Sequence, residues 1–236
     1  MILLGAAGAQ ADTIIDDFEN ADGGIWPLIA DDLGPIVSNS ESGLTGVVGG
    51  VRNAQLNFIS GPGIDPEWVN ADVDAFNPGN IEYGNAAGSL GSVSLTYDGG
   101  TGLNLDLTDP HGSGTTTDFD ASAILIDVII PGGGPGGIPF LPVDVSLTDG
   151  SATTSTVNRV ISAIGVVSIP LSEFIGLDWS DIDAINFAFA PNDVTRDFIL
   201  GSLEFDWVDE KIPEPATLAL FGVGLLGLGL ARRRRK

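Results

Sequence analysis

Few residues of this chain are suited to nucleophilic or metal-assisted catalysis. The sequence has one histidine, His111, and no cysteine, which excludes a thiol nucleophile and a multi-histidine metal centre. A Ser-His-Asp triad would have to use His111, which follows Asp109-Pro110 in a turn-like stretch, and no G-x-S-x-G motif accompanies it. We therefore expect a protein that is not an enzyme. A glycan-acting hydrolase or lyase with paired carboxylates stays open as an alternative, because the chain has 32 Asp and Glu residues.

The same carboxylates suit a hard cation better than they suit catalysis. Asp17 and Glu19 belong to the first expected strand, and Glu204 and Asp206 belong to the last one. If these strands are neighbours, the four side chains offer an oxygen-only site for structural calcium. Like charges on paired strands are destabilising without a counterion, which favours such a site. Two solvated strand faces are an equally good reading of the pattern.

Aromatic side chains in irregular stretches are candidates for sugar binding. Trp26, Trp68 and Tyr83 lie in such stretches, where an exposed ring can stack on a sugar. Burial in a core is the default alternative for each of them. Three arginines are rare cations among many acids, namely Arg52, Arg159 and Arg196. We expect each to pair with a neighbouring carboxylate rather than with a ligand.

Composition and charge narrow the possible partners. The 236 residues are 43% hydrophobic and 17% charged, so the chain can form a core. Nine basic residues against 32 acidic ones give a formal net charge of −23, which excludes nucleic acid as a partner. The absence of cysteine also excludes disulfides and leaves the redox compartment open.

Period-two alternation of apolar and polar residues dominates the middle of the chain. It predicts half-buried antiparallel strands, and two more continuously apolar runs, 123–130 and 182–190, predict central strands. A short helix is expected at 171–174, and residues 12–208 are expected to form one all-β domain, an antiparallel β-sandwich. The alternating strands are expected at 92–98, 103–108, 143–148 and 203–208.

The N-terminal residues 1–11 are apolar and uncharged. They end in Ala9-Gln10-Ala11, a small-x-small pattern typical of signal-peptidase cleavage. The composition becomes acidic at Asp12, so we interpret 1–11 as the remnant of a signal peptide. An ordinary first strand is the alternative.

The C-terminal residues combine three features in a fixed order. Residues 209–215 form a linker that contains Pro213-Glu214-Pro215. Residues 216–231 are uncharged and apolar, which predicts a single hydrophobic helix through a membrane. A basic cluster follows, and such a cluster is expected to stay on the cytoplasmic side of the membrane. Its members are Arg232, Arg233, Arg234, Arg235 and Lys236.

This arrangement resembles the PEP-CTERM sorting signal of exported bacterial proteins. The resemblance implies processing by exosortase near Pro213-Glu214-Pro215, transient anchoring in the inner membrane, and a final place in the outer envelope or extracellular matrix. It also implies a Gram-negative host that makes exopolysaccharide.

A second resemblance concerns the domain itself. An opening Ile15-Asp16-Asp17-Phe18-Glu19, a middle Leu95-Thr96-Tyr97-Asp98-Gly99 and a closing strand over 198–206 resemble galactose-binding-like jelly rolls, the fold of many carbohydrate-binding modules. That resemblance implies a mostly non-catalytic protein that often holds calcium. Together the patterns predict an exported, polysaccharide-associated β-sandwich, with a purely structural matrix protein as a further alternative.

Overall fold

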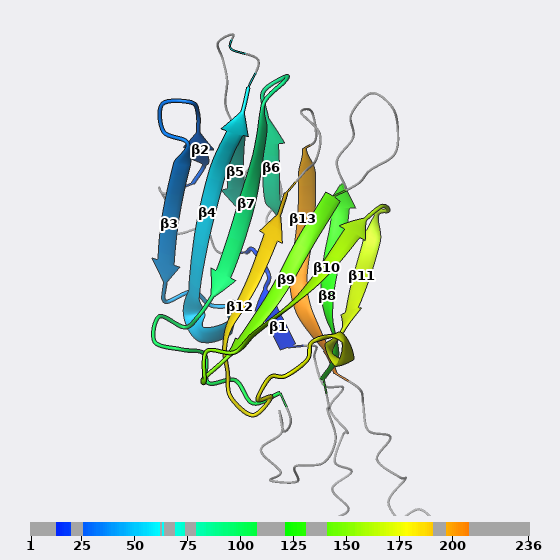
Figure 1. Ribbon diagram of the computed structural model, residues 1–236. Coiled ribbons are helices and arrows are strands. Elements are labelled where there is room, and N and C mark those ends of the chain that lie inside the picture. The colour runs from blue at the N-terminus through cyan, green and yellow to red at the C-terminus, as the bar shows by residue number, and fades with distance from the viewer. Residues whose placement is uncertain are drawn as a thin grey trace, which may run out of the picture.

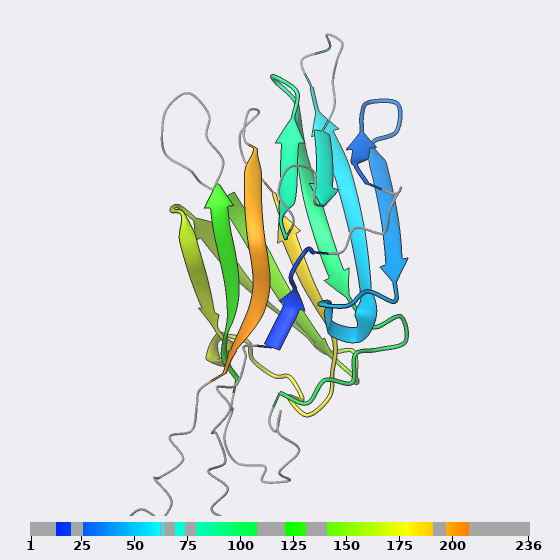
Figure 2. The same ribbon diagram turned by 180° about the vertical axis from the view of Figure 1, so that it is seen from behind.

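The computed structural model describes residues 13–19, 26–61, 63, 69–73, 79–107, 121–130, 141–190 and 197–207. These residues form two antiparallel sheets that pack face to face (Figure 1 and Figure 2). The antiparallel β-sandwich expected from the alternating pattern is therefore confirmed.

One sheet has seven strands in the order β11-β8-β13-β6-β5-β2, with β1 paired to β13 as well. Strand β13 pairs with β6 along one half of its edge, through Phe198–Leu200, and with β1 along the other half, through Leu203–Phe205. The strands are β1 (Thr13–Asp16), β2 (Leu28–Ala30), β5 (Val69–Val73), β6 (Ile81–Asn85), β8 (Ala121–Ile130), β11 (Gly165–Pro170) and β13 (Phe198–Trp207).

The other sheet has six strands in the order β10-β9-β12-β7-β4-β3. Figure 1 views the molecule from the side of this sheet. Its strands are β3 (Ile36–Ser42), β4 (Val51–Ser60), β7 (Leu90–Tyr97), β9 (Leu141–Asp149), β10 (Thr154–Ile161) and β12 (Ile182–Phe189).

The core lies between the two sheets because every second side chain of each strand points inward. In β7, for example, Val93, Leu95 and Tyr97 are buried while Ser92, Ser94 and Thr96 between them are only half-buried. Aromatic rings fill much of the space, with Phe187 stacked against Phe189 at 6.4 Å between ring centroids.

Most of the expected elements are present. The runs 92–98, 123–130, 143–148, 182–190 and 203–208 fall on β7, β8, β9, β12 and β13. The expected short helix appears as the 3-10 helix η2 (Leu171–Glu173), and a second one, η1 (Val48–Gly50), precedes β4.

The strand expected at 103–108 is wrong. Among residues 103–107 only Leu105 forms an isolated bridge, to Ile182. The backbone cannot stay extended here because Asn104 has a φ of 50° and Gly102 has a φ of 98°. The residues with alternating Leu therefore form an irregular loop, in which Leu107 is buried in the core.

Several expectations lie outside the described residues: the signal remnant with Ala9 and Ala11, the Pro213-Glu214-Pro215 motif, the apolar segment 216–231 and the basic cluster 232–236. In the part of the chain that the structure describes, no helix is long and apolar enough to cross a membrane.

Candidate functional site

The outward face of the six-stranded sheet carries hydroxyl and amide side chains instead of the acids that dominate the sequence. We call this set the polar face. Its side chains are half-buried or exposed, because the alternate residues of the same strands fill the core. The polar face consists of Ser38, Ser40, Asn53, Gln55, Ser94, Thr96, Ser146, Thr148, Thr154, Thr156, Asn158 and Asn186.

Strand register aligns part of the polar face into one row across all six strands. Each residue of this row is the direct cross-strand partner of the next. We call it the central row: it runs Ser40, Asn53, Thr96, Asn186, Ser146, Thr156 from β3 to β10. With strands about 4.8 Å apart, five such steps extend over roughly 24 Å. The row is therefore long enough to meet several units of an extended ligand at once.

Hydrogen bonds between neighbouring strands hold the polar face in place. Asn186 donates through Nδ2 to Thr96 Oγ1 at 2.7 Å and to Ser94 Oγ at 2.9 Å. The hydroxyls of Ser146 and Thr156 are 2.8 Å apart. A hydroxyl has one donor and two acceptor positions, so a single bond of this kind leaves it able to bind another group. The face is thus ordered before any ligand arrives.

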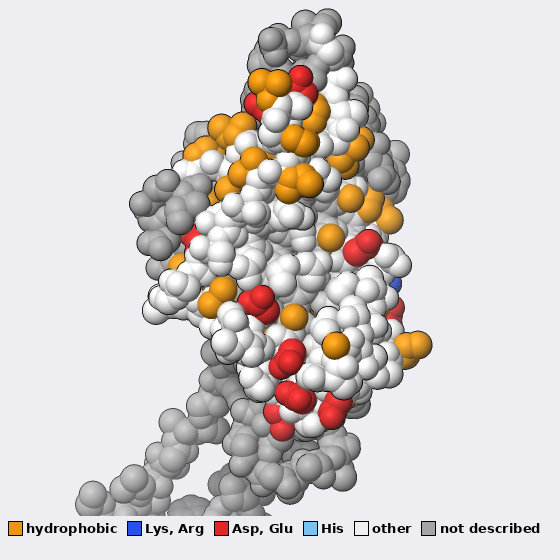
Figure 3. Space-filling model, turned by 60° about the vertical axis from the view of Figure 1, so that its left-hand side comes forward, with side chains coloured by type: hydrophobic (Ala, Val, Ile, Leu, Met, Phe, Trp, Pro, Cys, Tyr) orange, Lys and Arg blue, Asp and Glu red, His pale blue; other side chains and the backbone are white. Residues whose placement is uncertain are grey.

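Charge is sparse on this face and is acidic where it occurs. Asp144 lies beside the central row, where it accepts a hydrogen bond from Asn158 Nδ2 at 2.5 Å, and Asp98 accepts one from Asn53 Nδ2 at 3.1 Å. Figure 3 shows the side of the molecule with β3 and β4. Apolar side chains gather at its upper end, beside a few acidic atoms, and most of the acidic side chains lie toward its lower end, with mostly uncharged surface between. Three large apolar side chains of β3, β4 and the loop before β3 are exposed, namely Leu33, Ile36 and Ile59.

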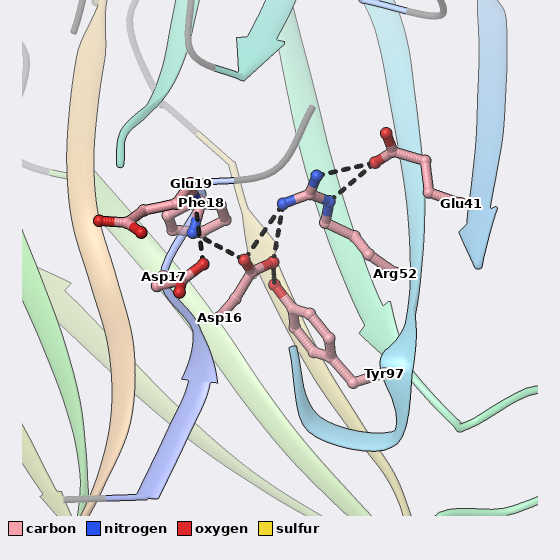
Figure 4. A network of polar contacts seen from close by, with 7 residues as sticks. All are labelled: Asp16, Asp17, Phe18, Glu19, Glu41, Arg52 and Tyr97. Carbon is pink, nitrogen blue, oxygen red and sulfur yellow. Dashed lines mark hydrogen bonds and ion pairs between the residues drawn. The ribbon is translucent and has the colours of Figure 1, made fainter. Parts of the chain in front are cut away.

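The described residues contain two basic side chains, Arg52 and Arg159, and both contact carboxylates as the sequence predicts, while Arg196 lies outside the described residues. Arg159 pairs with Glu173 near the surface. Arg52 is fully buried and pairs with Asp16 at 3.1 Å and with Glu41 at 2.8 Å (Figure 4). Neither guanidinium belongs to the polar face.

The network around Arg52 joins β1 to the β3–β4 hairpin. Asp16 accepts hydrogen bonds from Arg52, from the Tyr97 hydroxyl at 2.8 Å and from the Phe18 backbone N–H at 2.8 Å (Figure 4). Burial raises the pKa of Asp16, and the attraction of Arg52 opposes that rise only in part. These groups are inaccessible to a ligand, so the network supports the fold.

The four carboxylates expected to hold calcium are not grouped. The expected pairing of first and last strands is confirmed, since β1 pairs with β13. The register separates the side chains, however. Asp17 and Glu19 follow the last paired residue of β1, Asp16, whose partner is Leu203. Glu204 is the partner of Ile14, and Asp206 lies past the other end of the pairing. Within the described ranges, no group of three or more His, Asp or Glu residues could hold a metal ion.

The outcome differs among the three aromatic residues expected to bind sugar. The prediction of Tyr83 as a sugar platform is wrong, because Tyr83 is 1% exposed and its ring stacks on that of Phe198, with 4.9 Å between the ring centroids. Trp26 is half-buried and packs against the core, and the centroid of its ring lies 5.7 Å from the Arg52 guanidinium carbon. Trp68 lies outside the described residues.

A pair of carboxylates lies on the opposite sheet. Asp72 of β5 and Glu82 of β6 are direct cross-strand partners, and both are half-buried on the outward face. Partial burial and the nearby Asp72 charge raise the pKa of Glu82.

Comparisons with known proteins identify the C-terminal signal. The PEP-CTERM protein-sorting motif matches residues 211–236. The chain is therefore an exported protein with a signal for exosortase processing and transient anchoring in the membrane. Among curated proteins none matches the sequence significantly.

Solved structures resemble the sandwich only distantly. A family 11 carbohydrate-binding module of a cellulosomal cellulase from Clostridium thermocellum shares 13% identity over 85% of this chain and 96% of its own, with a TM-score of 0.38. A family 12 xyloglucanase from Bacillus licheniformis shares 9% identity over 72% and 98%, with a TM-score of 0.36. At these values neither likeness informs the function of this chain.

Proposed function

We propose that this protein is an exported, non-enzymatic component of the outer envelope or extracellular matrix that associates with polysaccharide through its polar face. The central row carries the proposal: six adjacent strands present hydroxyl and amide groups in direct register. Sugar hydroxyls both donate and accept hydrogen bonds, and so do Ser, Thr and Asn side chains. An ordered row of such groups can match a repeating chain of sugars.

Export and sorting supply the setting for this role. In the proposed sequence of events, segment 216–231 holds the protein in the inner membrane of a Gram-negative cell until exosortase acts near Pro213-Glu214-Pro215. Replacing these three residues with alanine is expected to leave full-length protein in the membrane fraction, as detected by immunoblotting. Unchanged processing and release of this variant would contradict the sorting part of the proposal.

Binding is tested with the full chain, kept soluble in a detergent that has no sugar headgroup. Asn186→Ala removes the donor that bridges Ser94 and Thr96, and should weaken binding to a responsive polysaccharide about fivefold, since one hydrogen bond contributes about 1 kcal/mol. Asn70→Ala is the matched control, because Asn70 is also a half-buried, outward-facing strand residue but lies on the other sheet. Equal affinities for the two variants would place binding elsewhere.

A hydrolase is the second candidate, and the Asp72–Glu82 pair is the observation that favours it. A glycosidase needs one protonated carboxyl and one ionised carboxylate across a sugar. Release of reducing sugar from a polysaccharide panel, abolished by Glu82→Gln, would support this candidate. We favour binding because the polar face extends across a whole sheet, whereas the pair occupies one cross-strand position.

A further inference from the structure

We propose that the polar face selects neutral polysaccharides, rejects anionic ones, and holds the chain of sugars across the strands. This inference rests on the proposed function and specifies its ligand. It follows from three features of the described residues: where the cations are, where the acids are, and how the polar groups are bounded.

No cation of the described residues is placed to receive an anionic sugar. The two arginines are held by carboxylates, with Arg52 fully buried and Arg159 paired with Glu173. The whole chain carries a formal charge of −23. An anionic polysaccharide therefore approaches a field of its own sign and has no partner on the face that could offset the repulsion.

Two acidic side chains lie at the polar face itself. Asp144 is the cross-strand partner of Asn158 and of Ala188, in the row next to the central row. Asp98 lies at the end of β7 and contacts the central-row residue Asn53. A carboxylate or sulfate on a sugar bound beside Asp144 or Asp98 would be repelled by that group. Neutral sugars can instead donate hydroxyl hydrogens to the same carboxylates.

The boundaries of the face set the direction of the ligand. Along a strand the polar stretch is short, because apolar residues follow it: Ile36 on β3, Ile59 on β4 and Val160 on β10 are 61%, 53% and 56% exposed. Across the strands the central row continues over the whole sheet. An extended chain of sugars finds hydroxyl and amide partners at every step only when it crosses the strands.

Calcium could in principle bridge an acidic protein to an acidic polysaccharide. The described residues contain no group of three or more acids close enough to hold a metal ion. The selection against anionic chains should therefore persist when calcium is present.

The test uses the full chain in the same detergent and pairs of probes with one backbone. Soluble neutral glucan, galactan, mannan and xylan are each compared with their own carboxylated derivative at low ionic strength, with calcium and with chelator. We expect at least one neutral chain to bind, and its carboxylated form to bind at least tenfold more weakly in both conditions. Raising the salt concentration should narrow that difference, because salt screens the repulsion.

Two variants connect the result to the face. Asp144→Asn keeps an oxygen that can accept from Asn158, and should recover part of the lost binding of the carboxylated probe. Asp127→Asn, on the outward side of β8 in the other sheet, is the matched control and should recover none. For the direction, Ser40→Ala and Thr156→Ala, at opposite ends of the central row, should weaken binding of a long chain and leave a disaccharide unaffected.

The outcomes separate the two proposals. Equal binding of a neutral chain and its carboxylated form, or calcium-dependent binding of the carboxylated form, would overturn the selection while polysaccharide association stands. Failure of every probe to bind would overturn both.

Discussion

Replacing Arg52 with methionine tests whether the buried network stabilises the sandwich. Arg52 is fully buried and contacts two carboxylates that are themselves buried, Asp16 at 3.1 Å and Glu41 at 2.8 Å. Methionine fills similar apolar volume but removes the charge, so both carboxylates would remain in the core without a cation. Removing one partner of a buried pair costs about 3–5 kcal/mol.

Urea unfolding of the full chain, followed by tryptophan fluorescence, measures the effect. With an m value of about 2 kcal/mol per molar urea, the expected loss lowers the unfolding midpoint by about 2 M. Arg159→Met is the control, because the Arg159 and Glu173 side chains are 31% and 37% exposed, and such a pair contributes about 1 kcal/mol or less.

The pH dependence gives a second measure of the same reasoning. Burial already raises the pKa of Asp16, and Arg52 opposes that rise, so the pKa of Asp16 should rise further in Arg52→Met. As the pH falls, protonation of Asp16 removes an unpaired charge from the core of the variant. The difference between the free energies of unfolding of the wild type and the variant should therefore shrink between about pH 7 and pH 4. A loss no larger than that of Arg159→Met, or one that grows on acidification, would refute the argument.

Three further predictions concern single residues. Hydrogen bonds from the Asp178 backbone, the Ser151 hydroxyl and nearby backbone N–H groups lower the pKa of Asp149 to about 2. The stability that this carboxylate adds is therefore present above about pH 4 and lost as the pH falls toward 2. The difference in urea midpoint between the wild type and Asp149→Asn should vanish at that low pH. Gly46→Ala should cost about 1–3 kcal/mol in urea unfolding, because Gly46 has a φ of 75° and a Cβ would lie 2.0 Å from Asp17 Oδ2. Tyr83→Phe should leave polysaccharide affinity unchanged in a titration, since Tyr83 is buried against Phe198; a several-fold loss would restore it as a ligand contact.

The alternating pattern predicted the fold well where each strand has one wet face. In β7, β9 and β13 the apolar residues recur at every second position, and burial follows them. The prediction of a strand at 103–108 used the same signal and was wrong, because the left-handed φ of Asn104 depends on the surrounding turn. The prediction of Tyr83 in an irregular stretch is also wrong, because Tyr83 belongs to strand β6, which places its side chain inward.

The polar face could not be predicted from the sequence because it depends on register. The strands at 92–98 and 143–148 show Ser and Thr on their wet sides, which is a visible signal. Only the pairing of Thr96 with Asn186, and of Asn186 with Ser146, aligns them into one row. Arg52 shows the same limit: its pairing with a carboxylate was predicted, but its partner Asp16 is 36 residues away in the chain.

The pairing of β1 with β13 has a consequence for how the protein folds during export. Thr13 and Phe205 are cross-strand partners, so nearly the whole chain must be exported before the first strand can pair with the last one. Contacts this far apart in sequence form slowly, because a long loop must close first. Until then Arg52 lacks its contact with Asp16 and has only Glu41 as a carboxylate partner of the two. The yield of folded protein should therefore depend on keeping β1 free of other contacts until the residues near 200 have been exported.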